Sequence, residues 1–413
     1  MNVNIHSEFG KLEAVITHTP GIEVEEMTPE TAKRALYSDI LNLSVAREEY
    51  QQMKGVLQAV STCYEVEDLL GEILQDDEVK YDLVQTICRQ EQAEMVQSDL
   101  LRSTPEELAK MLIQGVPVKR NNLTRYLSNE RFSLFPLHNF FFTRDASMSF
   151  GNEVLIGNMA NAVRNREALI MEAIFTHNEK VATKVIRANS AAEVNLEGGD
   201  FQVAREDILV IGTGVRTSTQ AIDSIIEHIK QKKQGLRHIL VQELPATPES
   251  FIHLDMVFTF LAPDACMTYE PLILHSTRFH TIHIEVDNGK VKRIYEEENL
   301  PKALAKLGMD MKPIACGGSK DIWTQEREQW HSGANFFAFA PGQIIGYERN
   351  VNTIEELHKN GFEVIKALDV IDGKSIIAEN QKCVVTIAGS ELARGGGGAR
   401  CMTMPVKRES ITN

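Results

Sequence analysis

A cysteine, Cys401, follows a run of four glycines in the stretch ARGGGGARCMTMP. A thiolate is a strong nucleophile. Glycine lets a backbone approach a ligand closely or adopt positive φ angles. A glycine run is also typical of a flexible linker. The residue types elsewhere in the chain must therefore show whether this segment is a reactive loop or a linker.

Other stretches place polar side chains beside apolar runs. In FIHLDMVFTF, His253 and Asp255 are two residues apart, so on a strand both side chains would point to the same face. FFFTRDASMS is expected to end a strand at Asp145, with Asn139 shortly before it, and NLEGGDFQV carries Glu197. Each pattern alone is weak, because an aspartate after a strand is usually a turn former.

Together these residue types suit a planar, cationic substrate. A carboxylate accepts the paired N–H groups of a guanidinium in charge-assisted hydrogen bonds, and two carboxylates could hold its central carbon against a thiolate. Arg164 and Arg216 each lie near the end of an expected strand and could bind a carboxylate on the same molecule. A ligand with a guanidinium at one end and a carboxylate at the other fits L-arginine.

The elements that must position these residues repeat one plan: a strand or hairpin, then a helix, then another strand. The segments that start at Glu153 and Asp207 follow this plan, and FTFLAPDACMTY and FAFAPGQIIGY share a hairpin pattern. Apolar residues alternate in the expected strands and recur with period 3.6 in the expected helices. We count about five modules around one core, which favours a radial, propeller-like α/β fold over one open parallel sheet.

Residues 67–127 differ from these modules because they are helical in period and nearly free of β-runs. Thr104 to Glu107 form a capping box with proline at the first helical position, and Gly115 is a plausible end of that helix. We predict one catalytic domain over residues 1–413, with a helical insertion at 67–127.

Composition excludes several classes of function. The formal net charge is −15, which disfavours binding to nucleic acid or to an anionic membrane. No basic segment followed by an apolar one marks a signal peptide, and no apolar run approaches the length of a membrane span. The six cysteines are scattered singly, as expected for reduced thiols in the cytoplasm.

The sequence lacks the complete motifs of common cofactor-binding and metal-binding sites. GTGVRT lacks the third glycine of a dinucleotide-binding turn, GKS at 373–375 lacks the first glycine of a P-loop, and no H-E-x-x-H occurs. His280 and His283 are three residues apart on an expected strand and so face opposite sides. We interpret both as structural histidines rather than metal ligands, and we expect neither a cofactor nor a metal.

Seven stretches, in this order, resemble the bacterial arginine deiminases of the guanidine-modifying hydrolase and amidinotransferase superfamily: THTPG, FFFTRD, VRNRE, LEGGD, GTGVRTS, HLDMVF and ARCMTMP. The resemblance covers nearly the whole chain. It implies a five-bladed α/β propeller of ββαβ modules with a helical insertion. It also implies hydrolysis of L-arginine to L-citrulline and ammonia, the first step of arginine catabolism by the deiminase pathway, in a homo-oligomer (dimer or tetramer) without a cofactor.

The resemblance also implies a role for each candidate residue. Cys401 would be the nucleophile, His253 the general acid and base, and Glu197 the residue that orients His253. Asp145 and Asp255 would grip the guanidinium. The positions that contact the amino-acid end or the aliphatic stem would be Asn139, Phe142, Arg164 and Arg216.

One departure from the family pattern is Gly396, which stands where relatives often have an arginine that reaches the substrate site. Arg400 is not its positional replacement. With glycine at this position, we expect the two aspartates to be unpaired in the free enzyme and the loop to be more mobile.

Three alternative functions stay open. An amidinotransferase would use the same thioether intermediate but give it to an amine. A silent arginine sensor would not need the thiol. A papain-like cysteine protease would need a local cysteine motif and an order of residues that this chain lacks.

Overall fold

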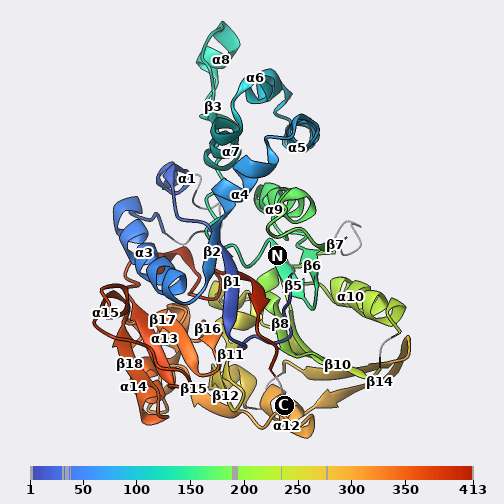
Figure 1. Cartoon of the computed structure of the whole chain (residues 1–413), viewed down its shortest axis with the longest axis vertical. Coiled ribbons are helices and arrows are strands. Elements are labelled where there is room, and N and C mark those ends of the chain that lie inside the picture. The colour runs from blue at the N-terminus through green and yellow to red at the C-terminus, as the bar shows by residue number, and fades with distance from the viewer. Residues whose placement is uncertain are drawn as a thin grey trace.

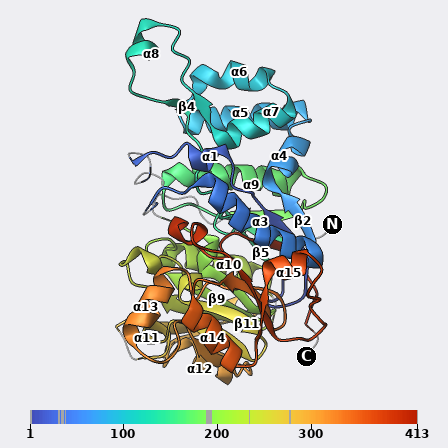
Figure 2. The same ribbon diagram turned by 90° about the vertical axis from the view of Figure 1, so that its left-hand side faces the viewer.

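The computed structural model describes residues 3–29, 32, 37, 39–187, 194–233, 235–275 and 278–411. Sheets and their covering helices form the lower part of the molecule in Figure 1, and a group of helices stands above them. The view turned by 90° in Figure 2 shows the same separation.

Five sheets in the described part of the chain share one pairing plan. In each, two strands form an antiparallel pair, and the second of them pairs in parallel with a third. The five sets are β20 (Met404–Arg408), β1 (Leu12–Thr17) and β2 (Thr62–Glu65); β5 (Ser147–Phe150), β6 (Glu153–Ile156) and β7 (Lys184–Arg187); β8 (Phe201–Arg205), β9 (Ile208–Thr213) and β10 (Arg237–Glu243); β11 (Phe258–Ala262), β12 (Ala265–Thr268) and β15 (Lys312–Ala315); and β16 (Phe337–Ala340), β17 (Gln343–Tyr347) and β19 (Cys383–Ile387).

Two of these sheets carry further strands. β13 (Thr281–Asp287) pairs antiparallel with β10, and β14 (Lys290–Glu297) pairs antiparallel with β13. β18 (Glu363–Lys366) pairs in parallel with β19. Both hairpins expected from FTFLAPDACMTY and FAFAPGQIIGY are confirmed, as β11–β12 and β16–β17.

Helices join the second strand of each set to the third. They are α3 (Leu43–Val60), α9 (Asn165–His177), α10 (Thr219–Gln231), α12 (Leu300–Lys306) and α14 (Val351–Lys359). α10 shows how the sequence places them: the Oγ of Ser218 accepts a hydrogen bond from the backbone N–H of Ala221 and caps the helix. Its isoleucines then recur at helical spacing and are buried against the β8–β9–β10 sheet. Shorter helices are α1 (Ile22–Glu25), α11 (Glu270–Ile273), α13 (Ile322–Trp330) and α15 (Ala367–Ile371).

The upper group of helices covers the segment expected to be helical. It contains α4 (Val66–Ile73), α5 (Asp77–Gln90), α6 (Gln97–Arg102), α7 (Pro105–Gln114) and α8 (Leu123–Leu127), with the short strands β3 (Val116–Pro117) and β4 (Phe132–Leu134). Thr104 and Glu107 form the expected capping box, and Gly115 ends α7 at φ 81°. α4 and α5 share one apolar core with α9, so this group packs against the helix that begins next to Arg164.

Two predictions of local structure are wrong. Residues 254–256 form a 3-10 turn rather than a strand, and β11 begins only at Phe258. Residues 138–146 are turns that precede β5, so Asp145 does not end a strand. In both places apolar residues that look like strand residues pack as turns, and the polar residues between them point into the protein.

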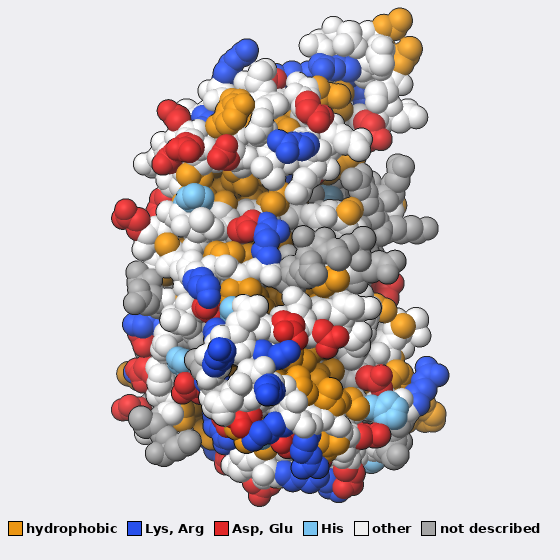
Figure 3. Space-filling view, turned by 90° about the vertical axis from the view of Figure 1, so that its right-hand side faces the viewer, with side chains coloured by type: hydrophobic (Ala, Val, Ile, Leu, Met, Phe, Trp, Pro, Cys, Tyr) orange, Lys and Arg blue, Asp and Glu red, His pale blue; other side chains and the backbone are white. Residues whose placement is uncertain are grey.

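Charged side chains of both signs lie on the surface. On the face shown in Figure 3, Lys and Arg side chains alternate with Asp and Glu side chains rather than forming one basic stripe. In the part of the chain that the structure describes, no helix combines the length and apolar character needed to cross a bilayer.

Candidate active site

All five proposed chemical residues lie in turns that lead into the first strand of a sheet. Asp145 precedes β5, Glu197 precedes β8, His253 and Asp255 precede β11, and Cys401 precedes β20. None of the five is more than 4% exposed. The strand pairing that the sheets share therefore brings these residues together in one buried site, although they are far apart in the sequence.

The thiol of Cys401 is held by a residue that the sequence analysis did not identify, Asn335. Its Nδ2 lies 3.1 Å from Sγ and donates to the backbone carbonyl of Asp255 at 3.1 Å. Its Oδ1 accepts from the backbone N–H groups of Arg400 (2.9 Å) and Cys401 (3.2 Å). One buried amide thus ties the loop that carries Cys401 to the turn that carries Asp255.

Asn335 could have been found from its position. It precedes β16, the first strand of the fifth sheet, just as the other candidates precede the first strands of theirs. The sequence analysis identified the β16–β17 hairpin but did not ask which polar residue comes before it.

His253 is held by two carboxylates. Its Nε2 is 2.9 Å from Oε2 of Glu197, and its Nδ1 is 3.8 Å from Oδ1 of Asp145. Burial lowers the pKa of His253, but Asp145, the hydrogen bond with Glu197 and the charge of Asp200 outweigh burial and raise it to about 9. The imidazole is therefore protonated at neutral pH and can act as an acid.

Glu197 is ionised although it is fully buried. Burial raises its pKa, but the hydrogen bond with His253 and the charges of Arg216, His253 and Arg164 lower it to about 2. Its Oε1 also accepts from the backbone N–H of Ala160 at 3.0 Å. These contacts fix the carboxylate that orients His253.

The two aspartates are paired with arginines, contrary to what the loss of a family arginine at Gly396 led us to expect. Oδ2 of Asp145 binds Nη1 of Arg164 at 2.7 Å, and Oδ2 of Asp255 binds Nη1 of Arg400 at 2.8 Å. Arg400 also binds both oxygens of Glu8 at 3.1 Å. The residue next to the nucleophile, rather than a residue at position 396, neutralises Asp255.

Oxygens of both aspartates lie near the reactive groups. Oδ1 of Asp145 is buried and accepts no hydrogen bond from the described residues. Both oxygens of Asp255 lie near Sγ of Cys401: Oδ2, which binds Arg400, at 3.7 Å and Oδ1, which does not, at 3.9 Å. Burial raises the pKa of Asp255, although the charge of Arg400 opposes this. Two carboxylate oxygens are thus available to a cationic ligand.

The other four candidates surround these groups in different ways. Arg164 uses Nε and Nη2 to bind Glu167 and Nη1 to bind Asp145. Arg216 is the more accessible of the two arginines, with a side chain 12% exposed and Nη1 at 3.5 Å from Glu197. Asn139 and Phe142 are buried in the turn before Asp145, where the carbonyl of Asn139 accepts from the N–H of Phe142 at 2.9 Å.

The glycine run is a packed loop and not a linker. Gly397 and Gly398 are buried, and a Cβ on Gly398 would lie 2.7 Å from Oδ1 of Asn335. Only a residue without a side chain allows the amide of Asn335 to reach the Cys401 backbone. Gly396 adopts φ 84° and is exposed, with open space where a Cβ would be.

The thiol of Cys401 is neutral in the free protein. Burial and the charges of Asp255 and Asp145 raise its pKa well above the usual value.

Asp145, Glu197 and His253 have ligand atoms close enough together to hold a metal ion. However, Nη1 of Arg164 lies 2.7 Å from Asp145 and 4.0 Å from Glu197, so cationic charge is already present there.

Solved structures with the same fold act on guanidino or amidino groups. The chain aligns over 99% of its length with 98% of an amidinotransferase from Microseira wollei, at a TM-score of 0.57 and 14% identity. It aligns over 96% of its length with 98% of the N-terminal domain of a cyanobacterial arginine dihydrolase, at a TM-score of 0.54 and 13% identity. These likenesses establish a mixed α/β fold shared with that group of enzymes.

Sequence comparison defines the family. The family model described as arginine deiminase matches residues 33–408. Arginine deiminases of Streptococcus pneumoniae and Streptococcus sanguinis are 31% and 32% identical to the chain, over 99% of both lengths in each case. The chain belongs to the arginine deiminase family. Membership identifies it as an enzyme with arginine deiminase activity and supports the conversion of arginine to citrulline.

Asn335→Ala tests whether the amide positions the nucleophile. We expect turnover to fall by roughly 10- to 100-fold, because small misplacements of reacting groups are costly. Alkylation of Cys401 by iodoacetamide, followed by peptide mass spectrometry, should also slow at each pH, since the thiolate loses a donor. Asn350→Ala is the control, because Asn350 is equally buried but donates to the carbonyl of His331. Native turnover and native alkylation in Asn335→Ala would contradict this role.

Proposed function

We propose that this enzyme hydrolyses L-arginine through a covalent amidino-thioether on Cys401. The observation that carries the proposal is the set of groups around Sγ. Oδ1 of Asp255 lies 3.9 Å from Sγ, the charge of Asp145 acts on the thiol, and Oδ1 of Asp145 lies 3.8 Å from Nδ1 of the buried acid His253. A guanidinium supplies the N–H donors that both oxygens need and the carbon that a thiolate attacks.

The two aspartates would bind the guanidinium from two sides, each with the oxygen that does not bind its arginine. Arg164 and Arg400 hold the other oxygens, so they would orient the carboxylates rather than compete for the substrate. Of the two arginines expected to bind the substrate's carboxylate, Arg216 is better placed, since Arg164 is fully engaged with Asp145 and Glu167. Asn139 and Phe142 would contact the amino-acid end and the aliphatic stem.

In the first half-reaction, the thiolate of Cys401 attacks the central guanidinium carbon and forms a tetrahedral adduct. His253 gives its proton to one terminal nitrogen, which leaves as ammonia when its bond to carbon breaks. The product on the enzyme is a cationic amidino-thioether. Its positive charge stays between Asp145 and Asp255.

In the second half-reaction, neutral His253 takes a proton from water as the water oxygen attacks the same carbon. The carbon–sulfur bond then breaks, sulfur leaves with its electron pair, and the remaining hydroxyl proton is lost to give citrulline. His253 has given one proton and recovered one. Glu197 acts only as a positioning residue that holds the ring.

Substrate binding would activate the nucleophile. In the free enzyme, burial and the charges of the two aspartates hold the pKa of the thiol well above its usual value. A guanidinium between them adds one positive charge beside Sγ, which favours the thiolate. The enzyme would thus have a reactive thiolate only when arginine is bound, with the thiol proton released to solvent.

The wider predictions from the sequence accompany this proposal. The five sheets with one pairing plan support a five-bladed propeller in which residues 67–127 are an insertion. Arginine catabolism by the deiminase pathway, a cytoplasmic location and a homo-oligomeric state stay predictions. An amidinotransferase is the alternative closest in chemistry, and ornithine plus an amidinated acceptor as products would favour it.

Cys401→Ala should abolish citrulline formation while the protein still folds and binds arginine. Rapid acid quenching of the native enzyme with arginine should trap an adduct on the peptide that contains Cys401, seen by mass spectrometry. His253→Asn should slow both half-reactions by about 10²–10⁴-fold. Substantial citrulline production by Cys401→Ala would rule out the covalent route, even if arginine remained the substrate.

Asp145→Asn and Asp255→Asn should each weaken arginine binding by roughly 2–5 kcal/mol, because each removes a buried charge that faces the guanidinium. Binding is measured by calorimetry in the Cys401→Ala background, where no turnover occurs. Asp264→Asn is the control, since that aspartate is exposed and pairs only with Lys382 in the described contacts. Wild-type affinity in either variant would show that the carboxylate does not hold the substrate.

A further inference from the structure

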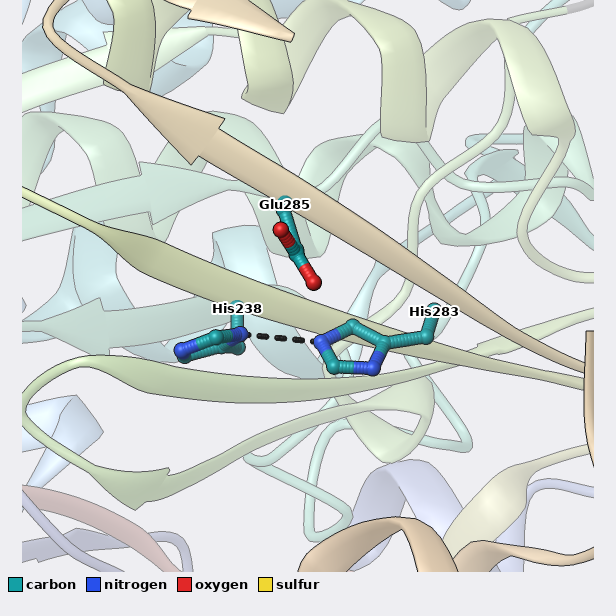
Figure 4. Close-up of side chains that lie close together, drawn as sticks. All are labelled: His238, His283 and Glu285. Atoms are coloured by element: carbon teal, nitrogen blue, oxygen red, sulfur yellow. Dashed lines mark hydrogen bonds between the residues drawn. The ribbon is translucent and has the colours of Figure 1, made fainter. Parts of the chain in front are cut away.

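Two histidines that the proposed function does not use lie together on the β10–β13–β14 sheet. Nδ1 of His238, on β10, is 2.9 Å from Nε2 of His283, on β13. Glu285 lies directly across from His238 in the pairing of these two strands. Figure 4 shows the carboxylate of Glu285 turned toward the space beside the two rings.

The three side chains share one face of the sheet because of the two-residue period of a strand. Ile239, Val241, Ile284 and Val286 point to the opposite face and pack in the core with the isoleucines of α10. His238, His283 and Glu285 therefore lie on the face that α12 covers. His283 is 2% exposed, whereas His238 and Glu285 are partly exposed and lie nearer to solvent.

His283 is oriented as a metal-ligating histidine usually is. Its Nδ1 is 2.8 Å from the hydroxyl of Tyr295 and 3.2 Å from Oε1 of Glu297. The hydroxyl of Tyr295 donates to Oε1 of Glu285 at 3.0 Å, so it accepts from the Nδ1–H of His283. This fixes the tautomer and leaves a lone pair on Nε2, and a carboxylate on the other ring nitrogen is the usual support of a metal-bound histidine.

We propose that His238, His283 and Glu285 bind one divalent transition-metal ion of the zinc type, which ties β10 to β13. One ligand atom from each residue lies within 4.8 Å of the others. Two imidazoles and a carboxylate form a donor set that suits Zn²⁺, with water as the fourth ligand. Zn–N bonds of about 2.0–2.1 Å in tetrahedral geometry separate the two nitrogens by about 3.3 Å, so the two rings need to move apart only slightly.

Binding would release no net proton. The proton on Nδ1 of His238, which now points to His283, would move to Nε2 of the same partly exposed ring, and Nδ1 would ligate the metal. The ion would replace the hydrogen bond between His238 and His283 with metal–ligand bonds that join β10 to β13. Its role would be structural, because it would bridge the strands that lead to the outer hairpin β13–β14 and not the site around Cys401.

The sequence analysis considered His283 together with His280 and set both aside. His280 is exposed and bonds to Glu296, so it does not belong to the site. The true neighbour of His283 is His238, which comes from another strand, and spacing along the chain gives no sign of that pairing.

Zn²⁺ titration of the full-length Cys401→Ala protein tests the proposal, since this background removes the active-site thiol. Calorimetry should show one equivalent bound with micromolar or tighter affinity (a Kd of about 1 μM or less), and Co²⁺ should give a tetrahedral absorption spectrum. His238→Gln and Glu285→Gln should each weaken binding at least about tenfold, while His280→Gln should not. Zn²⁺ should raise the melting temperature only where the site is intact.

Arginine turnover in His238→Gln, made in the otherwise native chain, should equal that of the unmodified enzyme. The proposal is overturned if no stoichiometric Zn²⁺ binds, or if binding survives unchanged in both His238→Gln and Glu285→Gln. Binding that depends instead on His253 would place the ion in the active site and would equally overturn it.

Discussion

The structure depends on buried carboxylates that stay close together because buried guanidinium groups neutralise them. Asp145 is held by Arg164, Asp255 by Arg400, and Glu197 lies within reach of both Arg164 and Arg216. Ions this deeply buried are costly unless they are paired and hydrogen-bonded. Each aspartate binds its arginine through one oxygen only, so that its other oxygen, near His253 for Asp145 and near Cys401 for Asp255, stays free of arginine. The ion pairs with arginine therefore allow the carboxylates to be buried and also leave carboxylate oxygens available for a cationic substrate.

Turns rather than strands or helices position the reactive side chains. Each of the five chemical residues lies a few residues before the first strand of a sheet, so a rigid hairpin fixes where its turn ends. Close packing sets the rest: a Cβ on Gly199 would lie 2.5 Å from the His253 ring, and one on Gly398 would collide with Asn335. A flexible loop would leave Sγ free to drift from its acid. These glycines make the site more rigid, because the absence of a side chain allows neighbouring chain segments to pack in direct contact.

Much of this could be predicted from the sequence, for identifiable reasons. The hairpins at 258–268 and 337–347 and the capping box at Thr104 are local patterns, and the structure confirms them. The site residues came from the resemblance and from the chemistry of a guanidinium. Contacts between distant residues could not be predicted. The binding of Arg400 to Asp255, the amide of Asn335 on Sγ and the His238–His283 pair join residues 45 to 145 positions apart. The strand expected at His253 failed because burial of two polar groups overrode an apolar pattern.

We propose that burial and the charges of Asp255 and Asp145 keep Cys401 neutral until a guanidinium cation binds between the two aspartates. The ultraviolet absorbance of the thiolate, taken as the difference between native enzyme and Cys401→Ala, measures this directly at neutral pH. A saturating guanidine that resembles arginine but is not turned over serves as the ligand. We expect no thiolate signal in the free enzyme and a signal of about one thiolate per active site with the ligand bound. A full thiolate signal without ligand, or none with it, would contradict the account.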